Sequence, residues 1–194
     1  MTQGMHPLGT GKYLPANAKF DIEMHYTTNG AEQTDQTEVG LYLLPEKPAH
    51  RLENLWVYDP NFKIKPGDAD AHSHAAYGFK QNATLYSLMP HMHLRGRWMK
   101  FELLSPDGRR ETLLSVPRYD FNWQRTYKLA KPRKIPAGSW VLVTGGYDNS
   151  SLNPANPDHS KTVRWGDQSF EEMFIGFLGV SWDSEPPSQA TASR

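Results

Sequence analysis

Two histidines one residue apart, His91 and His93, are the side chains of this 194-residue chain best placed for chemistry. They lie in the apolar run LMPHMHLRG, residues 88–96. In a strand, side chains alternate between two faces and the backbone rises about 3.3 Å per residue, so the two imidazoles would share one face with their backbones ~6.6 Å apart. Both could then bind one metal ion at about 2.0–2.1 Å, the length of a zinc–nitrogen bond. The pattern predicts a metal site that needs a further ligand.

The chain contains no cysteine, which excludes disulfides, thiolate metal sites and thiol nucleophiles. Histidine, methionine and carboxylate side chains remain as ligands. Met173 stands at the entrance to an apolar run, where most methionines simply fill gaps in a core. A thioether is nevertheless a soft ligand that selects copper(I) over zinc or magnesium. Two imidazoles and one thioether would make an open copper site, although spacing alone gives Met173 little weight.

Other histidines give weaker signals. The second His-x-His pair, His72 and His74, lies in a polar stretch, and we expect exposed loop residues there, with an auxiliary metal site as the less favoured alternative. His25 stands alone, and one histidine is not a site. A cupin would carry a glutamate a few residues after its His-x-His pair, where this chain has Gly-Arg-Trp at 96–98, so a cupin is disfavoured.

Composition excludes some partners. The 21 Lys and Arg residues balance the 21 Asp and Glu residues, so no overall field favours nucleic acid or an anionic membrane. No apolar run approaches the ~20 residues of a membrane span. The first six residues, MTQGMH, lack the charged start and apolar core of a signal peptide. We therefore expect neither a nucleic-acid partner nor a membrane span.

Short alternating runs separated by Gly and Pro predict the elements that hold these residues. They favour an all-β fold, a sandwich or jelly roll, and no helical periodicity lasts beyond two turns. Prolines at 45 and 48 mark the expected domain junction. We expect loops at 131–138 and 148–159. The expected strands are 20–26, 39–44, 55–58, 62–64, 72–79, 84–89, 98–104, 111–116, 119–127, 140–144 and one ending near residue 181.

Five motifs in a fixed order resemble the copper type II, ascorbate-dependent monooxygenases, the family of peptidylglycine hydroxylating and dopamine β-monooxygenases, and above all its bacterial members. The motifs are PHMHLRG at 90–96, YDFNWQ at 119–124, PAG at 136–138, YDNS at 147–150 and EEM at 171–173. The likeness covers residues 20–181 and is strongest from residue 88 onward. A shared order of five motifs is far more specific than any one of them.

The resemblance implies two linked jelly-roll-like sandwiches with one copper ion in each. The catalytic copper, held by His91, His93 and Met173, would bind dioxygen and direct it to an aliphatic C–H bond. The second copper has three histidine ligands and passes on electrons from ascorbate, and the last of these ligands maps onto His25. The resemblance also implies a location outside the cytoplasm, in the periplasm or secreted.

The chain also departs from the family. The adjacent His-His pair of the electron-transfer copper is absent before His25. We therefore expect residues 1–48 to be the final strands of a first sandwich, 49–183 to be the catalytic-copper sandwich and 184–194 to be a disordered tail. Peptide-amidating members hold their substrate's carboxylate with an Arg before the His-x-His pair and a Tyr after the Met. Those places hold Met89 and Phe177, which disfavours peptide amidation.

Two functions follow. The leading hypothesis is an oxidoreductase, a copper-dependent monooxygenase-like domain that activates dioxygen with ascorbate or an electron-donor protein as reductant and hydroxylates a small molecule that the sequence does not identify. The alternative is a non-catalytic copper-binding or interaction module that has lost its electron-transfer copper. In a third and plainer interpretation, the histidines of the sandwich are structural, and copper would then leave its stability unchanged.

Overall fold

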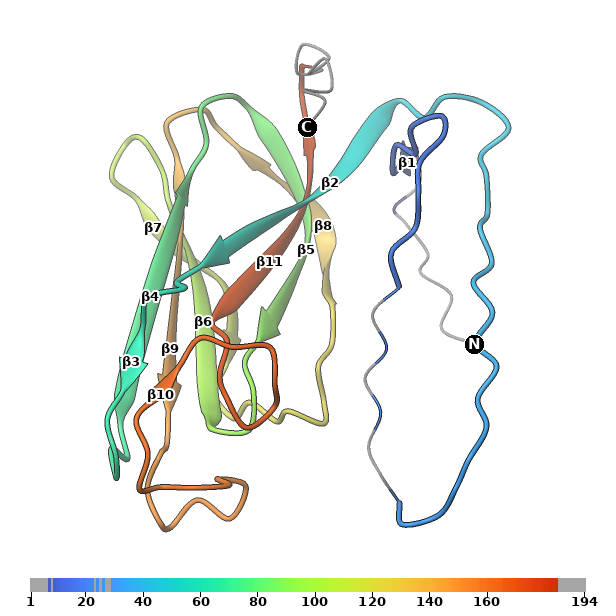
Figure 1. Cartoon of the computed structure of the whole chain (residues 1–194). Helices are drawn as coiled ribbons and strands as arrows, with labels where there is room; N and C mark the ends of the chain where they lie inside the picture. Colours follow the sequence, from blue (N-terminus) through green and yellow to red (C-terminus); the bar gives the residue numbers. More distant parts are fainter. Residues whose placement is uncertain (1–6, 8, 23, 25, 27–28, 185–194) are drawn as a thin grey trace.

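Two β-sheets lie face to face and enclose the apolar core of the molecule (Figure 1). The computed structural model describes residues 7, 9–22, 24, 26 and 29–184. Every regular element among these residues is a strand, so the predicted all-β sandwich is confirmed. The strands are β1 (Thr10–Gly11), β2 (His50–Tyr58), β3 (Lys63–Ile64), β4 (Ala71–Gly78), β5 (Ala83–His91), β6 (Gly96–Leu104), β7 (Arg110–Val116), β8 (Tyr127–Ile135), β9 (Trp140–Tyr147), β10 (Val163–Arg164) and β11 (Ile175–Trp182).

One sheet has five strands in the order β1-β2-β11-β5-β8, and the other has four in the order β4-β9-β6-β7. The short strands β3 and β10 form a separate antiparallel ribbon. The last strand, β11, lies between β2 and β5 and is antiparallel to both. Ile175, the first residue of β11, pairs with His91, the last residue of β5. The topology thus brings the segment before β11 to the end of the strand that carries the histidines.

Alternate side chains of the facing strands build the core. Leu88 and Leu178 of the five-stranded sheet are fully buried, as are Phe101 and Val143 of the other sheet. At Gly176 the two sheets approach so closely that a Cβ atom would lie 2.6 Å from Cε1 of Phe101. The residue must therefore lack a side chain for the sheets to pack at this distance.

Residues 119–127 do not form the strand that their alternating aromatic and polar side chains predicted. They form turns instead, in which Asp120 accepts the N–H of Asn122 at its Oδ1 (2.8 Å) and the N–H of Trp123 at its carbonyl (2.9 Å). Asp and Asn side chains compete with strand pairing through such local bonds. That prediction was wrong because it gave alternation more weight than turn chemistry, and only Tyr127 begins a strand.

The loop expected at residues 131–138 was also wrong, because β8 continues to Ile135. This strand pairs with β5 alone and is the edge of the five-stranded sheet. Its register with β5 breaks between Lys128 and Arg133, where Pro132 lies. Proline lacks the N–H of a ladder bond and is accepted at sheet edges and irregularities, so it did not end the strand.

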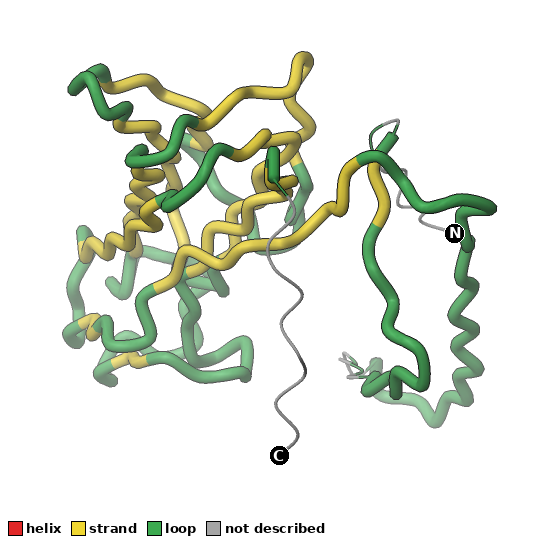
Figure 2. The backbone as a smooth tube through the Cα atoms, turned by 90° about the horizontal axis from the view of Figure 1, so that it is seen from above, coloured by secondary structure: helices red, strands yellow, loops and turns green. Residues whose placement is uncertain are grey.

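The described residues between 12 and 48 form an N-terminal arm that leaves the sandwich after β1 and returns at β2 (Figures 1 and 2). The described residues of the runs 20–26 and 39–44 belong to no strand, unlike the prediction. Their apolar side chains are exposed, as at Ile22 and Leu41. A strand needs a partner for its backbone N–H and C=O groups, and the described residues form no ladder with either run.

Some expectations lie beyond what the structure describes. His25 is outside the described residues, and so is the expected disordered tail apart from Ser184. The assignment of residues 1–48 to a first sandwich stays a prediction. Within the described part of the chain there is no helix with the length and apolar character needed to cross a membrane.

Candidate metal centre

The imidazoles of His91 and His93 lie side by side, as the sequence predicted. His91 ends β5, and His93 follows two residues later, before the turn into β6. Their ring centres are 5.3 Å apart and their planes are nearly perpendicular. Met92, between them, points into the core and is fully buried. The strand-like alternation therefore continues two residues past β5 and puts both imidazoles on the opposite side of the chain from Met92.

Hydrogen bonds fix the same tautomer in both rings. Nδ1 of His91 lies 2.6 Å from Oε1 of Gln124, whose amide nitrogen donates to the carbonyl of Phe121. Nδ1 of His93 lies 3.3 Å from the carbonyl oxygen of Glu171. Both partners are carbonyl oxygens that can only accept, so these two contacts favour the tautomer in which Nδ1 carries the hydrogen and Nε2 keeps its lone pair, and the Gln168 carbonyl is a further acceptor at the His93 ring. This is the arrangement that orients metal-binding histidines in proteins.

The environment also keeps the two rings neutral. Burial lowers the pKa of His91, opposed by the hydrogen bond to Gln124. Burial also lowers the pKa of His93, and the neighbouring His91 lowers it further, while the carbonyls of Glu171 and Gln168 oppose the shift. Metal ions bind the neutral form of imidazole. Both histidines are therefore in the binding form at neutral pH.

A buried carboxylate holds the turn that follows the histidines. Glu172 is fully buried and accepts the backbone N–H of His93 at Oε2 (2.7 Å) and of Arg95 at Oε1 (2.6 Å). Burial raises the pKa of Glu172 to about 7, although these N–H groups and the charge of Arg95 lower it. The two bonds connect the His93 turn directly to the segment that contains Met173.

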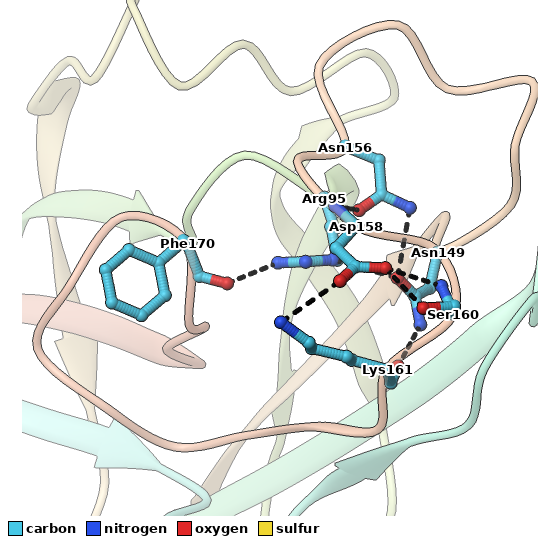
Figure 3. A network of polar contacts seen from close by, with 7 residues as sticks. All are labelled: Arg95, Asn149, Asn156, Asp158, Ser160, Lys161 and Phe170. Carbon is cyan, nitrogen blue, oxygen red and sulfur yellow. Dashed lines mark hydrogen bonds and ion pairs between the residues drawn. The ribbon is translucent and has the colours of Figure 1, made fainter.

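We call the two hydrogen bonds from the backbone of His93 and Arg95 to Glu172 the clamp. The side chain of Arg95 extends the clamp into a buried polar network (Figure 3). Its side chain is 2% exposed and donates from Nε to Oδ1 of Asn149 (2.9 Å) and from Nη1 to the carbonyl of Phe170 (2.9 Å). The amide nitrogen of Asn149 donates to the carbonyls of Lys65 and Lys161. The loops before β11 and after β9 are thus held against the histidine turn by hydrogen bonds.

Tyr119 supports the same turn from the core side. Its hydroxyl donates to the carbonyl of Met92 (2.6 Å) and accepts the N–H of Met92 (3.0 Å). Burial raises the pKa of Tyr119 well above its usual value, so the hydroxyl keeps its proton. Both backbone groups of the residue between the two histidines are therefore satisfied by one side chain.

Met173 lies in the segment that these contacts bring to the histidines. The β5–β11 register ends at the pair Ile175–His91, so Met173 lies two residues before the start of β11, and His93 lies two residues after the end of β5. The hydroxyl of Tyr147 donates to the Met173 carbonyl (2.8 Å), which fixes this backbone, and the side chain is partly exposed. Among the described residues, no three His, Asp or Glu side chains converge on one point. Two neighbouring imidazoles form a donor pair that suits several transition metals, copper and zinc among them.

The second histidine pair lies elsewhere. His72 and His74 are on β4 of the other sheet, which confirms the strand predicted at 72–79 and not the loop predicted for this pair, and both are exposed, as expected. Nε2 of His72 lies 3.2 Å from Oδ1 of Asp70, and the ring meets Trp98 edge-on. The structure therefore brings neither residue to His91 and His93.

The sequence did not identify the residues that hydrogen-bond to the two histidines and to the turn that carries them. Gln124, Tyr119, Asn149 and Glu172 all lie in the motifs that carry the family resemblance. The order of motifs was the only available signal, because each of these residues acts across a gap of 27 or more positions. Motif membership marked them, and the structure supplies their contacts.

No protein-family model and no curated protein matches the chain. Among solved structures, it is similar to the VP2 subviral particle of infectious bursal disease virus, with 10% identity and a TM-score of 0.33 over 74% of this chain and 36% of that one. It is also similar to dimeric latent PorU from Porphyromonas gingivalis (10% identity, TM-score 0.25, 69% and 13% covered) and to a ruminal GH26 endo-β-1,4-mannanase (9% identity, TM-score 0.26, 65% and 26% covered). The chain spans about a third of the viral proteins it matches. Likenesses this distant carry no argument about function.

Proposed function

We propose that the sandwich is the copper-binding domain of a copper type II monooxygenase-like protein. His91 and His93 would bind copper through Nε2, and Met173 would bind it through its sulfur. The observation that carries the proposal is the pair of Nδ1 hydrogen bonds, which leaves both Nε2 lone pairs available beside each other. The motif order of the sequence supports the same assignment. A location outside the cytoplasm belongs to this proposal.

Copper bound there would supply the chemistry that activates dioxygen for hydroxylation of an aliphatic C–H bond. The contribution of this chain's own residues is orientation. Gln124 and the Glu171 carbonyl fix the two rings, and Glu172 and Arg95 fix the turn that carries His93. The thioether of Met173 would favour the reduced metal. Ascorbate or an electron-donor protein would supply the electrons.

X-ray absorption of the copper(I)-loaded protein tests the ligand set. We expect one sulfur scatterer in the wild type and none in Met173→Ala. Met89→Ala is the matched control, because Met89 precedes His91 by two residues on β5 and its sulfur accepts a hydrogen bond from Thr126 (3.6 Å). A wild-type spectrum without sulfur, or sulfur that disappears only in Met89→Ala, would remove Met173 from the proposal.

The second candidate is a non-catalytic copper-binding module. It is favoured by the absence of an adjacent His-His pair anywhere in the sequence, which leaves the electron-transfer copper of the family incomplete. Oxygen uptake with ascorbate and a panel of small substrates separates the two functions. Uptake above that of free copper, lost in His93→Ala, supports the monooxygenase. Uptake equal to that of free copper supports the binding module.

A further inference from the structure

The N-terminal arm carries the only Asn-Gly sequence of the chain, Asn29-Gly30. Both residues are exposed, and the hydroxyl of Tyr26 donates to Oδ2 of Asp35 (2.9 Å), so the two ends of the loop around them are in contact. Gly30 has a φ of +80°, which glycine adopts without steric cost. A Cβ atom on Gly30 would meet no described atom within 4 Å beyond its chain neighbours. The dipeptide therefore lies in an open turn with room around its backbone.

The side chain of Asn29 is folded back over the backbone that follows it. Its Oδ1 accepts the N–H of Ala31 (3.1 Å), the bond of an Asx-turn. This bond turns the side-chain Cγ atom toward the amide nitrogen between the two residues, which belongs to Gly30. No described residue accepts a hydrogen bond from the N–H of Gly30. The nitrogen is therefore free to react with the Asn29 side chain.

An asparagine side chain and the next amide nitrogen can close a five-membered ring. After hydroxide ion removes the N–H proton, the Gly30 nitrogen attacks Cγ of Asn29. The new N–Cγ bond forms as the Cγ–Nδ2 bond breaks, and Nδ2 takes up a proton and leaves as ammonia. Water then opens the cyclic imide at either of its two carbonyl groups, which leaves aspartate or isoaspartate at position 29. The whole reaction consumes one water, releases one ammonia and needs no oxidant or reductant.

Contacts within the sandwich protect a second reactive pair, Asn149-Ser150. Asn149 is fully buried, and its Nδ2 donates to the carbonyls of Lys65 (2.8 Å) and Lys161 (3.0 Å). The attacking group is also occupied, because the N–H of Ser150 donates to Oδ1 of Asp148 (2.8 Å). Ring closure here would break all three bonds inside the protein, so the folded structure prevents it.

The other candidates are protected by local structure or by their neighbours. Asp107-Gly108 could form the same imide by losing water, but the N–H of Gly108 donates to the carbonyl of Ser105 (2.9 Å). Asn153 and Asn156 precede proline, which has no N–H to attack with. The remaining asparagines precede residues whose Cβ atom crowds the ring: Asn17, Asn54, Asn61, Asn82 and Asn122.

We propose that Asn29 is a site of spontaneous deamidation, at which aspartate and isoaspartate form far faster than at any other asparagine of the folded chain. Either product adds a negative charge to a loop that already contains Glu32 and Asp35. Isoaspartate also inserts one extra carbon atom into the main chain between the runs 20–26 and 39–44. The arm therefore changes with the age of the protein while the sandwich keeps its sequence. The inference is independent of the proposed copper site.

Incubation of the full chain in mildly alkaline buffer, followed by peptide mass spectrometry, tests the proposal. The peptide that contains Asn29 should gain one mass unit in ordinary water and three in heavy-oxygen water, because solvent opens the imide. Gly30→Ala keeps the asparagine and its exposure but disfavours the positive φ, and it should slow the conversion by about tenfold or more. Gly40→Ala is the matched control, because this arm glycine also has open space around it, and it should leave the rate unchanged.

Unfolding the protein separates the effect of structure from that of sequence. The peptide that contains Asn149 should keep its mass in the folded protein and should begin to convert in guanidinium chloride, where its buried contacts are lost. The rate at Asn29 should change little, because this residue is exposed in both states. An unchanged Asn29 peptide, equal rates in the wild type and Gly30→Ala, or conversion of Asn149 as fast as Asn29 in the folded protein would overturn the inference.

Discussion

At the scale of single residues, Glu172 makes the strongest prediction. Its two oxygens each accept one backbone N–H, and glutamine has the same shape but only one accepting atom. Glu172→Gln would leave one buried N–H facing an amide N–H₂, which costs about 1–3 kcal/mol. We expect the free energy of unfolding to fall by this amount and copper(I) affinity to fall about tenfold, because the His93 turn loosens.

Urea denaturation and competition with a copper(I) chelator would measure the two effects. Glu171→Gln is the matched control, because the Glu171 carboxylate accepts a single N–H, from Gln168, at a more exposed position. A copper affinity of Glu172→Gln equal to that of the wild type would show that the clamp supports the fold but does not position His93.

Gln124 makes a second prediction at this scale. Its Oε1 is the acceptor for Nδ1 of His91, and Gln124→Leu removes that acceptor with little change in volume. Loss of an outer partner of a metal-binding histidine usually costs about 10–100-fold in affinity. We expect a loss in this range in the chelator competition, with nearly unchanged stability because Gln124 is only partly buried. Gln124→Glu keeps an acceptor and should restore most of the affinity, and a variant that stays weak would speak against this role.

At the scale of strands, β11 positions the expected third ligand, and Gly176 lets it approach the other sheet. In Gly176→Ala the new Cβ atom would lie 2.6 Å from Cε1 of Phe101 and 2.8 Å from Cγ2 of Val143. Overpacking of a tight core costs about 1–3 kcal/mol, so we expect the free energy of unfolding to fall by that amount in urea. Gly40→Ala, which has open space around it, should change it by less than about 0.5 kcal/mol. Equal stability of the two variants would mean that the sheets adjust freely.

The histidine pair was predictable because its geometry is local. Alternation along a strand requires only neighbouring residues, and Met92, which points into the core between the two imidazoles, follows that rule. The clamp was not predictable, because Glu172 reaches His93 across 79 positions through the β5–β11 register. Patterns of polar and apolar residues do not specify which strands become neighbours.

Two of the predicted elements were wrong because the predictions considered each segment without its neighbours in the sheet. Alternation at residues 119–127 predicted a strand, but the side chain of Asp120 stabilises a turn. Proline at 132 predicted a loop, but an edge strand tolerates it. In both places the outcome depends on whether backbone groups have a partner strand. That information belongs to the sheet order rather than to the segment.

At the scale of the whole molecule, the N-terminal arm is the part whose sequence and structure disagree most. Its runs 20–26 and 39–44 alternate like strands, but their described residues form no strand pairing with the rest of the described chain, and Tyr42 and Leu43 are mostly exposed. Apolar strand-like runs without partners tend to associate. We expect the chain to self-associate as its concentration rises, unless a further sandwich covers these runs.

Sedimentation of the full chain beside a shortened chain of residues 49–194 would test this. The arm joins the sandwich through a two-residue parallel pairing of β1 with β2, so the shortened chain should keep its β-sheet circular dichroism and remain monomeric. A double variant, Ile22→Lys with Leu41→Lys, should also reduce association in the full chain, because it places like charges on both runs. If the full chain stays monomeric at high concentration, the exposed apolar runs of the arm do not drive association.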